Sequence, residues 1–292
     1  MRVQALSALD SQASELLNPL IQRSLKSETT RPCEFALELL AKHDPRRAVI
    51  QIAATLKTSY VTAERQRAAA LCAELDVPGA DRLLYTLIQD LTAAESADIR
   101  LEVIEAAEIR SRDNSQLAAS LAEFRTAREQ SAGDDPAAAF DECLVGGDPQ
   151  RGRQLFLNHI SAQCVRCHRV GRQGSNIGPR LDDVALRRDA KYLLRSIVAP
   201  SADIDDKYRS QVVVMNSGKV VQGLLLKKDD LSMTLADAQG QEVEIALADV
   251  EEFVDRKVSI MPEMTETLSR RQIRDLLAFL LTLETEVRPT AR

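Results

Sequence analysis

The sequence predicts a mainly helical protein with two domains and a small antiparallel β unit inserted in the second. Aromatic residues make up 3% of the 292 residues and Trp is absent, while Ala and Leu are plentiful. This composition favours helices that pack through small aliphatic side chains. Apolar residues recur at i, i+3, i+4 and i+7 through most of the first 130 residues, which is the pattern of helices that bury one face.

The first domain is expected over residues 1–130, as helix pairs that repeat about every 30 residues. Four leading helices are predicted, beginning at Arg2, Glu34, Arg65 and Arg100. Each is followed, after a short break, by a second helix in ELLNPLIQRSL, RRAVIQIAATL, ADRLLYTLIQDL and NSQLAASLAEF. The repeat resembles a HEAT-like α-α solenoid of about three and a half units. A non-repetitive helical bundle is the alternative.

Gly, Asp and Pro interrupt the helical pattern at residues 131–148, which are therefore predicted to be a linker. The second domain is expected over residues 149–292, and its first helix, PQRGRQLFLNH, leads directly to QCVRCH. Cys-x-x-Cys-His is the attachment signature of c-type haem. One turn of backbone presents two thiols to the vinyl groups of the porphyrin and directs the adjacent imidazole at the iron. Cys164 and Cys167 are thus predicted to form thioethers, with His168 as the proximal iron ligand.

Three further features follow in the order found in class I cytochromes c, which this domain resembles. They are GPRL at residues 178–181, SIMPEM at 259–264 and an amphipathic closing helix, LSRRQIRDLLAFLLTL. The resemblance implies that the Pro179 carbonyl accepts the Nδ1 hydrogen of His168, which fixes the orientation of the ligand. It also implies that Met261 is the distal iron ligand and that the closing helix crosses PQRGRQLFLNH. The fold expected for this domain is therefore that of cytochrome c.

A β insertion is expected at about residues 208–256, between the histidine and methionine motifs. Alternating and β-branched residues predict strands near 210–215, 219–227, 231–236 and 241–246. With this insertion, residues 145–283 resemble the planctomycete and verrucomicrobial type of haem-binding domain, a cytochrome c variant. GRQLF, APSADI, Gly218 and Gly223 match that family's pattern. The family domain often follows HEAT-like repeats and a sugar-dehydrogenase-like β-propeller.

The cofactor implied is one covalent haem c per chain, with its iron held by His168 and Met261. The function implied is electron transfer with a redox partner protein or a dehydrogenase domain, and no catalytic residue is expected. If Met261 does not ligate, a five-coordinate haem would make the chain a peroxidase-like enzyme, although the sequence offers no distal His or Arg pair suited to that. A third reading is an interaction module of HEAT-like repeats and haem domain without redox turnover.

Alternatives remain for individual residues of this site. His159 would complete a zinc site with the three motif side chains, but a zinc knuckle does not require GPRL or SIMP. Met264 is the alternative distal ligand. Met215 and Met233 fall on predicted strands, where they are expected to pack in the core.

The charge distribution limits the class of partner. The formal net charge of −6 argues against general nucleic-acid binding. Residues 145–209 are locally basic, with 12 Lys or Arg against 7 Asp or Glu. A basic collar there would pair with haem propionates or with an acidic redox partner, and a solvated surface is the alternative. Its members are Arg166, Arg169, Arg172 and Arg180.

The N-terminal residues bear on location. MRVQALSALDSQASELL lacks the apolar core of a secretory signal, and no apolar run approaches the roughly 18 residues of a membrane span. Covalent attachment of haem nevertheless takes place outside the bacterial cytoplasm. We therefore expect a periplasmic or cell-envelope protein, present here as a piece of a longer protein whose leader lies upstream.

Overall fold

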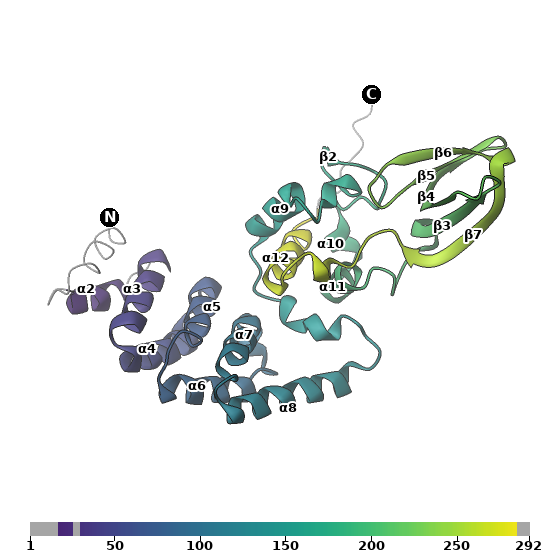
Figure 1. Cartoon of the computed structure of the whole chain (residues 1–292). Helices are drawn as coiled ribbons and strands as arrows, with labels where there is room; N and C mark the ends of the chain where they lie inside the picture. The colour runs from purple at the N-terminus through teal and green to yellow at the C-terminus, as the bar shows by residue number, and fades with distance from the viewer. Residues whose placement is uncertain (1–16, 26–29, 285–292) are drawn as a thin grey trace. The chain divides into compact units, whose positions relative to one another are not determined.

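The computed structural model describes residues 17–25 and 30–284. The chain divides between Gly133 and Asp134 into two compact units (Figure 1). Helices predominate, and one antiparallel sheet lies in the second unit. The mainly helical class with a small antiparallel β unit is therefore confirmed. The helix expected at Arg2 lies outside the described residues.

The helices of the first unit contact one another in two series. They are α2 (Leu17–Leu25), α3 (Thr30–His43), α4 (Pro45–Thr58), α5 (Thr62–Leu71), α6 (Pro78–Gln89), α7 (Arg100–Arg110) and α8 (Ser115–Ala132), with the 3-10 helix η1 (Ala94–Ser96). The leading helices contact in the order α3, α5, α7, and the second helices in the order α4, α6, α8. Consecutive helices such as α3 and α4 also contact, so the unit has two layers of helices.

Local chemistry fixes where several of these helices begin. Asp44 precedes Pro45 and its carboxylate accepts a hydrogen bond from the Arg47 N–H at 3.1 Å, which caps α4. Asn114 caps α8 in the same way through the N–H groups of Gln116 and Leu117. The α8 helix continues well beyond the predicted NSQLAASLAEF segment, because the next helix-ending residue is Gly133.

Two ion pairs join residues that lie about one repeat apart in the sequence. Arg67 Nε lies 2.7 Å from a Glu38 carboxylate oxygen, and Arg65 Nη1 lies 2.8 Å from Asp98. These pairs are partly exposed, so each contributes only about 0.2–1 kcal/mol. The first pair joins α5 to α3, and the second joins α5 to the turn before α7.

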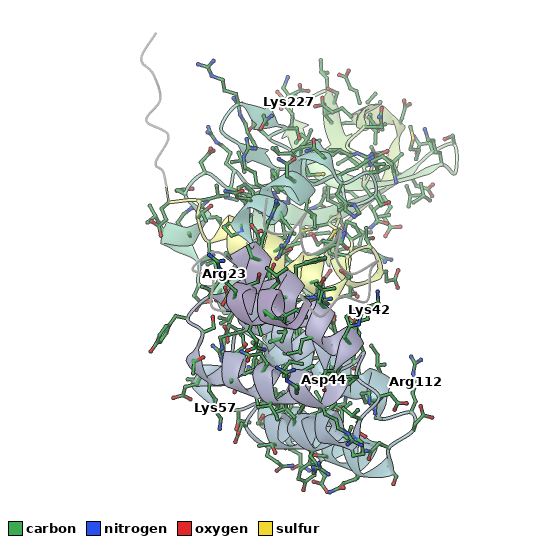
Figure 2. All side chains as sticks on the ribbon, turned by 90° about the vertical axis from the view of Figure 1, so that its left-hand side faces the viewer. Arg23, Lys42, Asp44, Lys57, Arg112 and Lys227 are labelled. Atoms are coloured by element: carbon green, nitrogen blue, oxygen red, sulfur yellow. The ribbon has the colours of Figure 1, made fainter. Side chains whose placement is uncertain are left out.

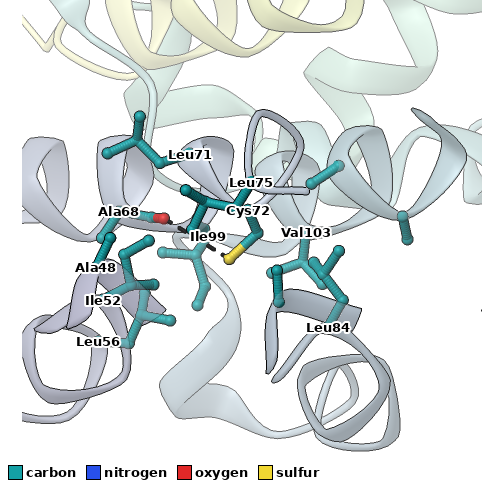
Figure 3. Packing of buried hydrophobic residues seen from close by; sticks show 14 of the residues in the cluster. Ala48, Ile52, Leu56, Ala68, Leu71, Cys72, Leu75, Leu84, Ile99 and Val103 are labelled. Carbon is teal, nitrogen blue, oxygen red and sulfur yellow. Dashed lines mark hydrogen bonds between the residues drawn. The ribbon is translucent and has the colours of Figure 1, made fainter. Parts of the chain in front are cut away.

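The core of the first unit consists of aliphatic side chains and one cysteine (Figure 3). Ile52, Leu84 and Val103 come from α4, α6 and α7 and are fully buried. Cys72 lies among them, and its Sγ is 3.9 Å from the Ala68 carbonyl oxygen. Charged side chains such as Arg23, Lys57 and Arg112 are exposed on the surface (Figure 2). Among the described residues, none of the helices combines the length and the apolar character needed to cross a membrane.

The helical part of the second unit is built around the crossing of its first and last α-helices. Its elements are η2 (Ala138–Cys143), α9 (Pro149–Asn158), η3 (Cys164–Arg166), α10 (Val184–Arg187), α11 (Ala190–Val198), η4 (Asp206–Tyr208), η6 (Met264–Glu266) and α12 (Arg270–Leu280). Gly152 of α9 lies directly against the backbone of α12 at Asp275. The rings of Phe156 and Phe279 meet beside it, with centroids 5.6 Å apart.

The segment expected as a linker contributes to the core of the second unit. Ala137, Ala138 and Cys143 are buried in or beside η2. Glu142 is buried there as well and forms an ion pair with Arg270, the first residue of α12. Gly, Asp and Pro do interrupt the α-helical pattern in this segment, but they produce a 3-10 helix that packs against α12.

The insertion forms a five-stranded antiparallel sheet in the order β6-β5-β4-β3-β7. Its strands are β3 (Arg209–Met215), β4 (Val220–Lys228), β5 (Ser232–Ala236), β6 (Glu242–Ala246) and β7 (Val250–Ser259), with η5 (Leu247–Asp249) before the last. Met233 and Met215 pack in or against its core, together with Val213. The sequence indicated four of these strands and missed β7, which is an edge strand with mostly exposed side chains.

Candidate cofactor site

The Cys-x-x-Cys-His segment forms one tight turn after α9. Gln163 adopts a φ of 43°, and it is the one non-glycine residue with positive φ in the described parts of the chain. Holding a side-chain-bearing residue in the left-handed region costs about 1 kcal/mol or more. The turn then closes with the His168 N–H donating to the Cys164 carbonyl at 2.9 Å. The turn contains the 3-10 helix η3, and Cys167 and His168 follow it directly.

The imidazole of His168 is held by the loop that follows it. Its Nδ1 lies 3.0 Å from the Pro179 carbonyl oxygen, which is the hydrogen bond that the resemblance implies. Because a carbonyl can only accept, Nδ1 carries the proton and Nε2 keeps its lone pair. Burial lowers the pKa of His168, and the bond to Pro179 partly offsets this. The ring is therefore neutral and suited to bind a metal through Nε2.

Gly178 lets the loop approach the ring closely. A Cβ at this position would lie 3.0 Å from Cε1 and 3.1 Å from Nδ1 of His168. The Gly178 N–H also donates to the Cys167 carbonyl at 2.8 Å. Glycine thus permits the contact that places the Pro179 carbonyl against the ligand.

Asp182 fixes the remainder of this loop. Its carboxylate accepts hydrogen bonds from the Gly171 N–H and from two nitrogens of Arg180, at 3.0 and 2.8 Å. Burial raises the pKa of Asp182, but the bonds from Gly171 and Arg180 outweigh this effect and the net pKa is lowered. The charged carboxylate is thereby stabilised, and it ties the start of the loop to the segment next to Pro179.

A cavity of about 570 Å³ opens beside His168. The Cys-x-x-Cys-His turn supplies Cys164, Cys167 and His168 to its wall. Other lining residues come from α11, from the β insertion, from the loop before η6 and from η6 itself; they include Leu193, Ile197, Leu224, Ala238, Met261 and Met264. The volume lies within the range of cofactor pockets. Apolar surface predominates in the lining, and charged side chains such as Arg187, Asp205 and Lys207 also contribute to it.

Met261 and Met264 both line the cavity but differ in burial. Met264 opens η6 and is 4% exposed in the core formed with α11 and α12. Met261 is half-buried on the preceding loop, and its N–H donates to Ser259 Oγ at 3.0 Å. The structure therefore brings Met261 to the same cavity as His168, and it brings Met264 there as well.

The two thiols of the motif are protonated at neutral pH. Burial, with a smaller effect from nearby Cys167, raises the pKa of Cys164 to about 11. Burial also raises the pKa of Cys167, and Arg166 partly opposes it. Neither cysteine is in a disulfide. Both are therefore available as neutral thiols, which is the form that adds across a vinyl group.

The zinc alternative lacks its set of ligands in this structure. His159 ends α9 as its C-cap, and its Nδ1 accepts a hydrogen bond from the Ala162 N–H at 3.1 Å. Over residues 17–25 and 30–284, no three His, Cys, Asp or Glu side chains gather closely enough to hold a metal ion.

The four arginines of the basic collar are not all at the cavity. Arg166 and Arg180 line it, although Arg180 is also paired with Asp182. Arg169 donates through Nε to the Gly171 carbonyl at 3.0 Å, and Arg172 is exposed in the turn between β1 (Arg169–Val170) and β2 (Gln173–Gly174).

Sequence reasoning missed the walls of the cavity that come from α11 and from the insertion. Leu193 and Ile197 are four residues apart on α11, so helical periodicity after GPRL was the signal that could have located them. Leu224 of β4 and Ala238 of the β5–β6 turn carry no comparable signal, because tertiary packing alone brings them to the cavity.

The residues present fit a covalently attached porphyrin. Two neutral thiols, a neutral imidazole with its Nδ1 hydrogen bonded, two thioethers and an apolar cavity meet in one place. The cytochrome c family model matches residues 149–236, from the start of α9 to the end of β5. A comparison with the curated proteins found no match. The family match supports a cytochrome c-like domain that binds haem c and has an electron-transfer role, and it ends before Met261.

Proposed function

We propose that the chain is a monohaem c-type electron-transfer protein. In this proposal Cys164 and Cys167 would attach the haem, and His168 and Met261 would be the ligands of its iron. The observation that carries it is His168, which is hydrogen bonded to the Pro179 carbonyl at 3.0 Å and lies in the wall of the cavity that both cysteines and Met261 also line.

The bound haem would supply the one-electron chemistry, with its iron alternating between the ferric and ferrous states. The protein's residues set the conditions for it. The Pro179 carbonyl orients the imidazole of His168 and increases its basicity. The Met261 thioether favours the ferrous state and so raises the reduction potential. The apolar side chains of α11 that line the cavity, Leu193 and Ile197, would limit the access of water to the haem.

The first unit supports a second part of the proposal, a HEAT-like array that binds the partner. Its leading helices contact in the series α3, α5, α7 and its second helices in the series α4, α6, α8, as stacked helix pairs would. We propose that this array holds a dehydrogenase or another redox protein near the haem domain. The location proposed is the periplasm or cell envelope, where cytochrome c domains often occur and where haem is attached covalently.

Covalent haem attachment is the first test of this proposal. The chain is expressed with a cytochrome c maturation system, denatured, and analysed by the pyridine haemochrome spectrum after acid-acetone extraction. We expect about one haem retained per chain, because the chain has one Cys-x-x-Cys-His motif. The double variant Cys164→Ala/Cys167→Ala is the matched control and should retain none. No retained haem in the unchanged protein would overturn the proposal.

A further inference from the structure

The loop that carries Met261 leaves the β insertion at an irregular point of its sheet. Strand β7 pairs with β3 and ends at Ser259, two residues before Met261. The register shifts there: Arg209 faces Ser259, whereas the next residue, Ser210, faces Arg256. The extra residues in β7 form a bulge, and bulges redirect a strand next to functional sites. The insertion therefore directs the chain into the methionine loop.

At this point two hydrogen bonds to serine hydroxyls take the place of the regular backbone hydrogen bonds of the sheet. The Ser259 N–H donates to Ser201 Oγ at 3.1 Å, and the Met261 N–H donates to Ser259 Oγ at 3.0 Å. Ser201 lies three residues after the end of α11. The residue before it, Pro200, is buried and lines the cavity. The two bonds thus join the end of α11, the end of β7 and the backbone of Met261 in one chain.

The residues that follow Met261 in the loop restrain its backbone little. Pro262 follows it and has no N–H to donate. Pro262 and Glu263 are exposed, so packing restrains them little. The side chain of Met261 packs against the core of the second unit, and the hydrogen bond from its N–H to Ser259 Oγ holds its backbone from the N-terminal side.

We infer that Ser201 and Ser259 are positioning residues for the distal ligand, and that the β insertion serves to place the Met261 thioether at the cavity. Ser259 also lines the cavity, and both serines act on the distal ligand through the backbone of Met261. The inference rests on the proposed function, because it assigns these serines a role only if Met261 binds the haem iron.

Competition between Met261 and added imidazole tests this inference. Imidazole is titrated into the ferric protein, and the weak red charge-transfer band that methionine ligation gives to ferric haem is followed. In Ser259→Ala the apparent dissociation constant for imidazole should fall about fivefold, the effect of losing one hydrogen bond that held the competing ligand. Ser201→Ala should change it in the same direction. Ser259→Thr keeps the hydroxyl and should restore the unchanged protein's value.

Ser232→Ala is the matched control, because Ser232 lies in β5 of the same insertion and its exposed hydroxyl binds Glu244 at 3.1 Å. It should leave the imidazole titration unchanged. Equal dissociation constants in Ser259→Ala, Ser201→Ala and Ser232→Ala, with covalent haem retained in all three, would overturn the inference alone. Absence of covalent haem from the unchanged protein would overturn the proposed function and this inference with it.

Discussion

At the scale of single residues, Met261 and Met264 lie close in sequence and line one cavity, but they have different surroundings. In Met261→Ala we expect the red charge-transfer band to disappear and the midpoint potential to fall, because the ferric iron loses its thioether ligand. In Met264→Ala we expect the band to remain. That variant should instead lose about 2–5 kcal/mol of unfolding free energy, because Met264 is 4% exposed in the core.

Visible and near-infrared spectra, redox titration and urea denaturation of both variants measure these effects. The two changes are alike in size, so each variant is the control for the other. Loss of the band in Met264→Ala and its retention in Met261→Ala would assign the distal ligand to Met264.

Cys72 makes the stability of the first unit dependent on pH. Burial raises the pKa of its thiol from an ordinary 9.0 to about 12, and a hydrogen bond to its own backbone opposes this only partly. The folded state therefore keeps the proton at a pH where the unfolded state loses it. This stabilisation is fully present below pH 9 and is lost as the pH rises from 9 towards 12.

At pH 10 the loss should be about 1.4 kcal/mol relative to pH 8. Urea denaturation of the unchanged protein and of Cys72→Ala at both pH values measures it. Other groups titrate in this range, but their effects cancel in the difference between the two proteins. The stability advantage of the unchanged protein should shrink at pH 10, and a constant difference would contradict the prediction.

The sequence predicted those residues of the candidate site whose chemistry is local. Cys164, Cys167 and His168 lie within five consecutive positions, so their spacing alone carries the signal. Pro179 followed from a resemblance to a known family. Ser201 is a different case, because it lies 58 residues from Ser259 and only the folded chain brings the two together.

At the scale of elements, the crossing of α9 and α12 depends on Gly152. A Cβ on Gly152 would overlap the Asp275 carbonyl and lie 2.8 Å from Phe279 Cβ. Both neighbours belong to the rigid frame of α12, so the helices would have to separate. We expect Gly152→Ala to lower the unfolding free energy by about 3 kcal/mol, which exceeds the helix propensity that Ala gains.

Gly79→Ala is the matched control for this prediction. Gly79 also lies in the first turns of a helix that begins with proline, but its added Cβ would meet Val49 at an ordinary 3.4 Å. Thermal or urea denaturation should show this variant within about 1 kcal/mol of the unchanged protein, or slightly more stable. Equal effects of the two substitutions would show that the crossing has room for a methyl group.

Whether the sequence predicted a helix or strand depended on how far its side chains are buried. Helices such as α4 and α9 were predicted because they bury one face and carry a proline and an aspartate at their start. Strand β7 was missed because none of its side chains is fully buried, so its sequence shows little of the contrast that burial imposes. The other edge strand, β6, was predicted and buries Ile245. The neighbour of β7 in the sheet is β3, but β4, β5 and β6 lie between the two strands along the chain. The sequence alone does not indicate that β3 and β7 pair.

At the scale of the whole molecule, the division of the chain at Gly133 and Asp134 puts residues 134–148 with the second unit. Their buried side chains belong to its core, and buried Glu142 pairs with Arg270 of α12. The sequence favoured a linker because Gly, Asp and Pro break an α-helix. These residues equally permit the 3-10 turns of η2, and only the contact with α12 distinguishes the two outcomes.

Two fragments test where the second unit begins. Residues 134–292 should fold without the first unit and retain covalent haem, because the cores of the two units share no residue among those described. Residues 149–292 keep the motif and α9 but lose buried Ala137, Ala138 and Cys143, and they leave Arg270 without Glu142. We expect the shorter fragment to be less stable by about 3 kcal/mol. Its melting temperature should therefore be lower by roughly 6–12 °C.

Calorimetry and the pyridine haemochrome spectrum of both fragments measure these effects, and Cys143→Ala in the longer fragment isolates the contribution of one buried side chain. That variant should have a melting temperature between those of the two fragments. Equal melting temperatures for the two fragments would mean that η2 adds nothing to the core, so that the haem domain would begin at α9 and the preceding segment would serve as a linker after all.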